Sequence, residues 1–322
     1  MHGIESPAMA AIETKSLTKR FGDVVAVRNL DLTVEEGEIF GFLGPNGAGK
    51  STTINMLLDF MRPSDGTATV LGYDAQDESR TIRDRIGILP DGYRLYDRLT
   101  AREHLEFAID AKDATNDPAV LIDRVGLSQE DADRKVGGYS KGMTQRLALA
   151  AALVGDPDLL ILDEPSSGLD PHGIAEMREL LREEADRGTA VFFSSHILSE
   201  VDAVCDRVGI MNDGELVAQN TVERLRELTG SRSQLLLSVE RVPTGLDLTA
   251  IDGVSEVSVE ESMLRVSFSD PVTKPQVVKR VDAATTVTDI KSEEASLEEL
   301  FTTYTTGDEP EDEPDARMEV TA

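Results

Sequence analysis

The chain has 322 residues, a formal net charge of −29 at pH 7 and a single cysteine. This length allows one large domain or two ordinary ones, each with enough residues to bury a core. One cysteine excludes an intramolecular disulfide, and so acidic a balance argues against nucleic-acid binding through a broad basic face.

The acidic residues are spread along the whole chain. This distribution favours a protein adapted to a cytoplasm with molar salt, as in a halophile. There the Debye length falls to about 3 Å, so repulsion between surface carboxylates is largely screened. The alternative is an ordinary acidic protein with a solvated tail.

The first residues do not resemble a targeting sequence. Residues 1–8 lack a basic segment followed by an apolar one, so we expect a flexible leader rather than a secretory signal. No apolar stretch approaches the length of about 18 residues that a membrane-spanning helix needs. The sequence therefore predicts a cytoplasmic protein that meets a membrane only through a partner.

A glycine-rich segment at residues 44–51 carries the most specific motif of the chain, with the form G-x-x-x-x-G-K-S. It follows an apolar run at residues 39–43 that predicts a buried strand. In this motif backbone N–H groups surround phosphate, the lysine contacts the β- and γ-phosphates, and the serine hydroxyl ligates Mg²⁺. The predicted nucleotide site therefore comprises Gly44, Pro45, Asn46, Gly47, Ala48, Gly49, Lys50 and Ser51, with Ser51 as a metal ligand.

Residues 52–58, directly after this loop, predict a helix whose positive N-terminus faces the phosphates. Thr52, at the start of that helix, is counted with the nucleotide site. The alternative is a glycine-rich turn that matches the pattern without binding phosphate. A strand, a helix and the Lys-Ser pair in register all argue against this alternative.

The middle of the chain predicts alternating helices and strands. Apolar residues at helical spacing predict helices at residues 101–112 and 144–154, which form a helical insertion. Short apolar runs at residues 158–162 and 190–193 predict buried parallel strands. The Asn-Asp-Gly turn at residues 212–214 lies between two apolar runs and predicts a β-hairpin.

Two carboxylates, Asp163 and Glu164, follow the strand predicted at residues 158–162. Ligands bind at the carboxyl ends of strands in parallel sheets. Asp163 would hold Mg²⁺, directly or through water, and Glu164 would orient and deprotonate an attacking water. An acidic strand end alone usually marks a turn, but downstream of a phosphate-binding loop it indicates a nucleoside triphosphatase.

A second anion site is predicted at the start of a helix, in Tyr139-Ser140-Lys141-Gly142-Met143. A hydroxyl and exposed N–H groups at a helix N-terminus can bind an anion, and a capped helix without a ligand is the alternative. The segment resembles the L-S-G-G-Q signature of the ATP-binding subunits of ABC transporters. Ser140 and Gly142 match the signature, whereas the other three residues replace its Leu, first Gly and Gln.

The resemblance implies further roles in the nucleotide site. It implies that Asp170 belongs to the family's D-loop and binds at the nucleotide. It also implies that His196 is a switch histidine that contacts the γ-phosphate, beside Glu164 and Lys50 in the catalytic group, and that Phe21 stacks on adenine. The alternatives are a structural histidine at residue 196 and an ordinary core phenylalanine at residue 21.

One position departs from the family's pattern. The family usually places Gln, or sometimes Glu, after a strand in the lid that touches the membrane subunit, and here that position is Asp91. An ionised Asp is shorter and cannot donate a hydrogen bond, which weakens the case for direct contact with Mg²⁺ or water. We count Asp91 with the nucleotide site and expect the loop after it to form a coupling surface, with a solvated loop as the alternative.

A second unit is predicted at residues 230–305, followed by a disordered acidic tail at residues 306–322. Its strands are predicted at residues 234–239, 254–259, 263–268 and 285–290, and its helix at residues 271–283. A capping box that begins at Ser296 predicts another helix. This mixture indicates a small α+β domain.

The resemblance covers residues 9–229 and implies an α/β fold. The fold would be a P-loop NTPase core with a helical subdomain and an antiparallel β portion, followed by the small α+β domain. The implied function is ATP hydrolysis, with ATP and Mg²⁺, that powers a separate membrane permease of an exporter. The alternatives are a soluble ABC-type ATPase of DNA repair or translation, and a binding module without activity.

The implied partners come from the same resemblance. They are an integral-membrane permease and a second ATPase chain, bound when ATP binds, with no nucleic acid. The second chain would be another copy, or a different ATPase subunit in a heterodimer. The protein would lie at the cytoplasmic face of the membrane through its permease.

Overall fold

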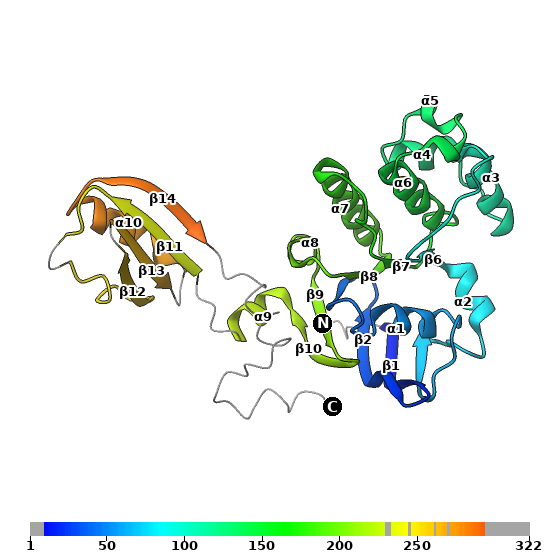
Figure 1. Ribbon diagram of the computed structural model, residues 1–322, viewed down its shortest axis with the longest axis horizontal. Coiled ribbons are helices and arrows are strands. Elements are labelled where there is room, and N and C mark those ends of the chain that lie inside the picture. The colour runs from blue at the N-terminus through cyan, green and yellow to red at the C-terminus, as the bar shows by residue number, and fades with distance from the viewer. Residues whose placement is uncertain (1–9, 229–232, 244–245, 261, 269–270, 294–322) are drawn as a thin grey trace, which may run out of the picture. The chain divides into compact units, whose positions relative to one another are not determined.

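The structure is a computed structural model that describes residues 10–228, 233–243, 246–260, 262–268 and 271–293. The chain divides into two units, one that ends at Val222 and one that begins at Glu223 (Figure 1). The predicted leader, the acidic tail and the helix predicted to begin at Ser296 lie outside the described residues. Within the described residues, no helix has both the length and the apolar character needed to span a membrane.

A six-stranded sheet forms the centre of the first unit, with the strand order β10-β9-β3-β8-β7-β6. Its strands are β3 (Ile39–Leu43), β6 (Ile86–Leu89), β7 (Leu159–Asp163), β8 (Ala190–Ser195), β9 (Arg207–Asn212) and β10 (Glu215–Thr221). All are parallel except β10, which pairs antiparallel with β9 in the predicted hairpin. Strands β3, β7 and β8 are buried along their whole length, as their continuous apolar runs predict.

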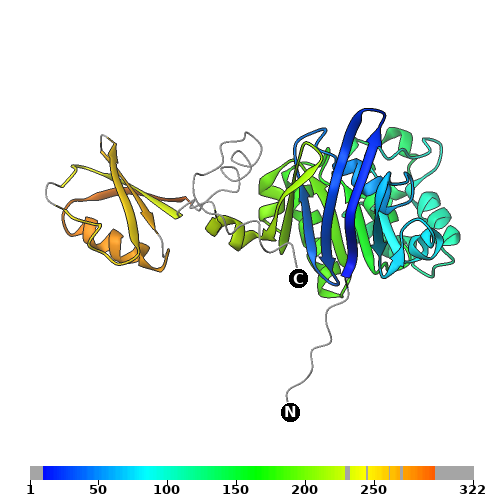
Figure 2. The same cartoon turned by 90° about the horizontal axis from the view of Figure 1, so that it is seen from below.

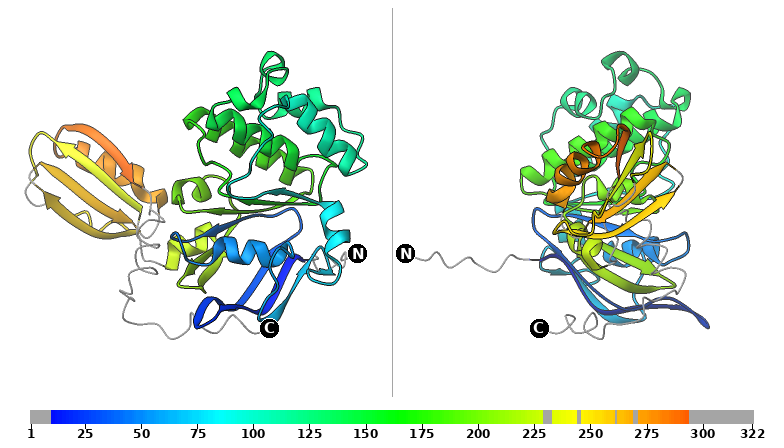
Figure 3. Two further views of the ribbon diagram at one scale, coloured as in Figure 1. Left: turned by 45° about the vertical axis from the view of Figure 1, so that its right-hand side comes forward. Right: turned by 90° about the vertical axis from the view of Figure 1, so that its left-hand side faces the viewer.

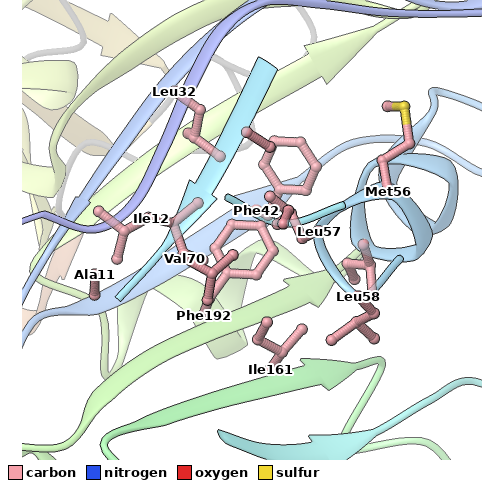
Figure 4. Close-up of a cluster of buried hydrophobic side chains, with 14 of the residues drawn as sticks. Ala11, Ile12, Leu32, Phe42, Met56, Leu57, Leu58, Val70, Ile161 and Phe192 are labelled. Atoms are coloured by element: carbon pink, nitrogen blue, oxygen red, sulfur yellow. The ribbon is translucent and has the colours of Figure 1, made fainter. Parts of the chain in front are cut away.

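A second sheet of this unit is antiparallel, with the order β2-β1-β4-β5. Its strands are β1 (Ala10–Phe21), β2 (Val24–Glu35), β4 (Asp65–Val70) and β5 (Tyr73–Asp74). Figure 2 shows β1 and β2 as long strands across one side of the unit. Ile12, Leu32 and Val70 of this sheet share a core with Phe42 and Phe192 of the central sheet, beside helix α1 (Lys50–Leu57) (Figure 4). The predicted antiparallel β portion is therefore present.

Four helices between β6 and β7 form the predicted helical subdomain, here called the helical lobe. They are α3 (Ala101–Ala111), α4 (Pro118–Arg124), α5 (Gln129–Ala132) and α6 (Lys141–Ala152). The lobe and the antiparallel sheet lie on opposite sides of the central sheet (Figures 1 and 3). The other helices of the unit are α2 (Ser79–Arg85), α7 (Pro171–Asp186) and α8 (Leu198–Asp202), and α9 (Val222–Leu228) lies at the boundary.

Two helix boundaries differ from the predictions. Helix α6 begins at Lys141, earlier than the predicted residue 144, because the Ser140 hydroxyl accepts the Met143 N–H at 3.2 Å and caps the first turn. Helix α3 begins at a capping box that the apolar spacing does not reveal. There Thr100 accepts the N–H of Glu103, and Glu103 accepts the N–H of Thr100.

The second unit has an antiparallel sheet with the order β12-β13-β11-β14. Its strands are β11 (Ser233–Val239), β12 (Val254–Glu260), β13 (Met263–Phe268) and β14 (Val287–Glu293). Helix α10 (Lys274–Asp282) supplies Val277 and Val281 to an apolar core with Leu237 and Val266. The predicted helix at residues 271–283 is thus shorter, because Pro271–Thr273 form a 3₁₀ turn, and β14 begins later than predicted.

Candidate nucleotide site

The candidate site lies where three neighbouring parallel strands end. Strand β3 leads into the glycine-rich loop, β7 ends at Asp163, and β8 ends one residue before His196. The register pairs Leu43 with Ser195 and Asp163 with Ser194. The carboxyl ends of these strands therefore bring segments that lie far apart in the sequence to one edge of the sheet.

The glycine-rich loop needs glycine at two close contacts. A Cβ atom at Gly44 would lie 2.5 Å from the Met211 carbonyl oxygen. A Cβ atom at Gly49 would lie 2.6 Å from the Ala26 carbonyl oxygen, and its φ of +109° also favours glycine. Because Gly49 occupies the N-cap position of α1, no side chain caps that helix. The loop thus leaves the helix N-terminus open to an anion, which suits a phosphate site.

Lys50 is the buried cation of the site, with 6% of its surface exposed. Its Nζ donates to the carbonyl oxygens of Gly44 at 2.6 Å and Pro45 at 3.3 Å. It also lies 3.8 Å from Glu164 Oε1. Burial lowers the pKa of Lys50, and the charges of Glu164 and Asp163 act in the opposite direction. The arrangement supplies a positive charge within reach of the loop and of the Glu164 carboxylate.

Glu164 is held on both sides. Its carboxylate lies between Lys50 Nζ and His196 Nδ1, which is 2.8 Å from Glu164 Oε2. Its backbone has a φ of +51°, in the left-handed region, and its N–H donates to Ser194 Oγ at 3.1 Å. Gln145 of α6 donates to the Pro165 carbonyl oxygen at 2.8 Å. The turn that carries Glu164 is therefore fixed by contacts from a strand and from the helical lobe.

Ser194 is a site residue that the sequence patterns do not reveal. Its buried hydroxyl donates to Asp163 Oδ1 and accepts the N–H of Glu164, so one side chain positions both carboxylates. The only signal in the sequence is a small polar residue at the end of an apolar run. Its partners lie at the end of β7, and pairing between strands far apart in sequence cannot be read from the run itself.

The donor set suits Mg²⁺. Asp163 is 4% exposed and brings one carboxylate to the strand end, and the exposed Ser51 lies in the first turn of α1. Mg²⁺ usually takes one or two protein oxygens and completes its shell with water and substrate phosphates. Accordingly, the described residues contain no group of three or more His, Cys, Asp or Glu side chains that could hold a metal ion by themselves.

The other predicted residues come from other elements of the first unit. Phe21 ends β1 and is 48% exposed, so the alternative of a core phenylalanine is wrong. Ser140 and Asp170 cap α6 and α7, respectively, and both are exposed. Gly142 lies in the first turn of α6, and Asp91 is exposed in the segment after β6. In the part of the chain that the structure describes, neither Lys50 nor Glu164 has a side-chain hydrogen bond or ion pair with any of these five residues.

The fold and the site together define a P-loop nucleoside triphosphatase. Residues 27–167 match the ABC transporter family. Over 297 residues the chain is 34% identical to the bacitracin transport ATP-binding protein BcrA of Enterococcus faecalis, covering 90% of this chain and 94% of that protein. Over 305 residues it is 32% identical to the linearmycin resistance ATP-binding protein LnrL of Bacillus subtilis, covering 91% and 98%. The chain therefore belongs to the ATP-binding subunits of ABC transporters.

Other similarities span about the length of the first unit. An uncharacterized ABC transporter ATP-binding protein of Nostoc is 46% identical over 216 residues, which span 65% of this chain and 63% of that protein. A solved ATP-binding subunit of an ABC transporter is 30% identical, with a TM-score of 0.63 over 68% of this chain and 93% of its own. A dimeric bacterial ABC transporter cassette is 26% identical, with a TM-score of 0.61 over 66% and 98%.

Membership in this family fixes the class of activity. The chain is an ATPase that uses ATP with Mg²⁺, and its hydrolysis powers transport by an ABC transporter. Relatives of this kind favour the transport subunit over the alternative of a soluble ABC-type ATPase in DNA repair or translation. The intact lysine and glutamate of the site argue against a binding module without activity.

Proposed function

We propose that these residues form the ATPase site, each with a defined role. Lys50 and the loop residues bind the β- and γ-phosphates, and Phe21 stacks on adenine. Ser51 and Asp163 hold Mg²⁺, which neutralises charge on the phosphates when bound. Glu164 accepts a proton from the attacking water, and His196 holds Glu164 and contacts the γ-phosphate.

The observation that carries this proposal is the position of Glu164 between Lys50 Nζ at 3.8 Å and His196 Nδ1 at 2.8 Å. The histidine contacts one carboxylate oxygen and the lysine lies near the other, so the carboxylate is held in one orientation, and general-base catalysis depends on such positioning. The hydrogen bond from its backbone N–H to Ser194 restricts it further. The alternative, a structural histidine, gives no reason for the contact to the catalytic carboxylate.

The test is the variant Glu164→Gln. We expect it to bind ATP like the wild type but to hydrolyse it about 10²–10⁴-fold more slowly, because a neutral amide cannot accept the proton. The measurements are phosphate release and affinity for a fluorescent ATP analogue. Glu38→Gln is a matched control, because Glu38 is a buried carboxylate paired with Arg207 at 3.2 Å, before the start of β3 and away from the site. Near-normal turnover by Glu164→Gln would reject the proposed base.

We further propose that the nucleotide is held between two chains. Ser140, Gly142 and Asp170 are at helix starts and are accessible to solvent, so they are suited to reach the nucleotide of a second chain. The dimeric state of a similar cassette supports this arrangement. The second chain would be another copy or a different ATPase subunit, and Asp91 would approach the same site from the lid.

The remaining proposals concern the transporter. We propose that the chain acts at the cytoplasmic face of the membrane, bound to an integral-membrane permease, in a halophilic cell. The names of two relatives, one for bacitracin transport and one for linearmycin resistance, support an exporter. Deletion of the gene should then sensitise the cell to a cargo compound, and a Glu164→Gln copy should not restore resistance. A nutrient requirement without such sensitivity would indicate import instead.

A further inference from the structure

A buried carboxylate, Glu200, lies behind the two segments that carry Glu164 and His196. It belongs to the short helix α8 and is 3% exposed. Its Oε2 atom accepts hydrogen bonds from Ser166 Oγ at 2.7 Å and Ser195 Oγ at 3.0 Å. Both serines are themselves buried, so one carboxylate oxygen joins two chain segments inside the protein.

The two serines are next to the catalytic residues. Ser166 comes two residues after Glu164, in a turn closed by the hydrogen bond from the Ser167 N–H to the Glu164 carbonyl oxygen at 3.1 Å. Ser195 directly precedes His196 and also accepts the N–H of Ile197 at 2.9 Å. Glu200 thus bridges the segments on both sides of the hydrogen bond between Glu164 and His196.

The two carboxylate oxygens of Glu200 are used unequally. Glu200 Oε1 is buried and has no hydrogen-bond partner among the described residues. A buried polar atom without a partner costs stability, but the other oxygen satisfies two buried hydroxyls that an apolar side chain would leave without an acceptor. The position therefore supplies a single acceptor oxygen shared by two hydroxyls on separate segments, an arrangement suited to fixing the geometry of a site.

We propose that Glu200 is a positioning residue, which fixes the spacing between the turn of Glu164 and the segment of His196 through Ser166 and Ser195. This inference rests on the proposed roles of Glu164 and His196. Glu200 itself touches neither ATP nor the attacking water. Loss of the bridge would let the general base and its histidine drift apart, and a displacement of about 1 Å at such a site costs up to about 10²-fold in rate.

The test compares three variants of the full chain. We expect Glu200→Ala to lower kcat for ATP hydrolysis by about 10-fold to 100-fold, with little change in KM, because the phosphate-binding loop is untouched. Glu200→Gln should restore most of kcat, since its amide oxygen can accept both hydroxyls. Glu38→Ala, which breaks a buried ion pair elsewhere in the unit, should lower the melting temperature without lowering kcat of the folded protein.

A second route covers the case in which Glu200→Ala does not fold. The double variant Ser166→Ala/Ser195→Ala removes the bridge and keeps the carboxylate, and we expect the same selective loss of kcat. The proposal would be overturned if kcat stayed unchanged in Glu200→Ala or in the double variant. It would also be overturned if a higher KM, rather than a lower kcat, accounted for the loss of kcat/KM. These outcomes differ from failure of the proposed function, because that failure would appear as a near-normal rate in Glu164→Gln.

Discussion

The two parts of the nucleotide site differ in how far one chain assembles them. Lys50, Glu164 and His196 are connected by contacts of 3.8 Å and 2.8 Å. Ser140 and Asp170, in contrast, use their side chains to cap their own helices. The first part is connected within the chain, whereas the second consists of helix N-termini with no hydrogen bond or ion pair to the side chains of Lys50 or Glu164 among the described residues. If the proposed roles hold, the difference teaches that catalysis and dimer closure depend on separate groups of residues in one unit.

The cause of this difference lies in the topology. Lys50, Glu164 and His196 follow β3, β7 and β8, which are neighbours in one parallel sheet. The carboxyl ends of these strands therefore lie at the same edge of the sheet. The second part comes from the starts of α6 and α7, which are helix ends rather than strand ends. Each helix start keeps backbone N–H groups that the helix cannot satisfy internally. At α6 the Ser140 hydroxyl accepts one of them, the N–H of Met143.

The largest expected effect is the loss of ATP-dependent dimer formation when the start of α6 is changed and the phosphate-binding loop is left intact. In a Glu164→Gln background, which slows hydrolysis, we expect ATP to produce a dimer and ADP to release it. Adding Ser140→Arg should abolish the dimer, because a long side chain at this helix start blocks closure, while binding of ATP to the loop persists. Sedimentation or light scattering at high salt and high protein concentration gives the measurement.

Ser128→Arg is the matched control for this prediction. Ser128 is also an N-cap serine of the helical lobe, so both changes lose a cap, at a cost of about 1 kcal/mol, and add the same charge. The control should still form the dimer with ATP. A monomer under every condition in the Glu164→Gln background would reject the two-chain site, unless a different ATPase subunit is the partner, which mixing with that subunit would reveal.

The next effect tests the connected part of the site through Ser194. Ser194→Ala removes the donor to Asp163 and the acceptor for the Glu164 N–H. Supporting contacts of this kind typically contribute about 10-fold to 100-fold, and we expect kcat to fall within that range. Thr189→Ala removes a buried hydroxyl bond to the Pro157 carbonyl oxygen beside the other end of β8 and should leave kcat unchanged. An equal fall in kcat in Ser194→Ala and Thr189→Ala would indicate that both changes only destabilise the fold.

The connected part of the site was also the more predictable one. The glycine-rich loop and the carboxylates at the end of β7 could be predicted from local patterns, because continuous apolar runs indicate buried parallel strands and each motif lies directly after such a run. Ser194 and Glu200 could not be predicted, since they act on partners 31 and 34 residues away in the sequence, respectively. Their role depends on strand register, which a local pattern does not contain.

The antiparallel sheet was predicted in kind but not in detail. Strands β1 and β2 pair with several register shifts, so neither gives a regular alternation of buried and exposed residues. The boundary of α10 shows a different limit. The sequence predicts a helix from Pro271, but the first turn forms a 3₁₀ segment and the α-helix starts at Lys274, with a proline in its first turn.

A smaller effect concerns the exposed aromatic residue assigned to adenine. Phe21 is 48% exposed at the end of β1, and Lys19 Nζ lies 5.2 Å from the centre of its ring. Stacking of a base on an aromatic ring contributes about 1–3 kcal/mol, so Phe21→Ala should weaken ATP binding by about 10-fold. Phe21→Trp should retain the affinity, and the exposed Phe60→Ala should not change it. Unchanged ATP affinity in Phe21→Ala would remove it from the site.

The smallest effect comes from bringing two acidic surfaces together. Each copy carries a formal charge of −29, so closure of a dimer is opposed by repulsion. The Debye length shortens from about 10 Å at 0.1 M to about 3 Å at 1 M salt. We therefore expect the ATP-bound Glu164→Gln dimer to form more tightly as KCl rises from tenths of molar to several molar. The melting temperature of the free chain should climb over the same range.

Two controls distinguish screening from other effects of concentrated salt. Sucrose at equal osmolality strengthens burial by exclusion from the surface but screens no charge, so it should raise the melting temperature without tightening the dimer as KCl does. A chain that ends at residue 305 lacks the acidic tail and should melt at nearly the same temperature, because the repulsion arises from acids spread over the whole chain. A melting temperature that stays flat or falls with KCl would contradict adaptation to salt. The acidic tail would then be the main source of the charge effect. In that case removal of the tail, rather than added KCl, should change the melting temperature.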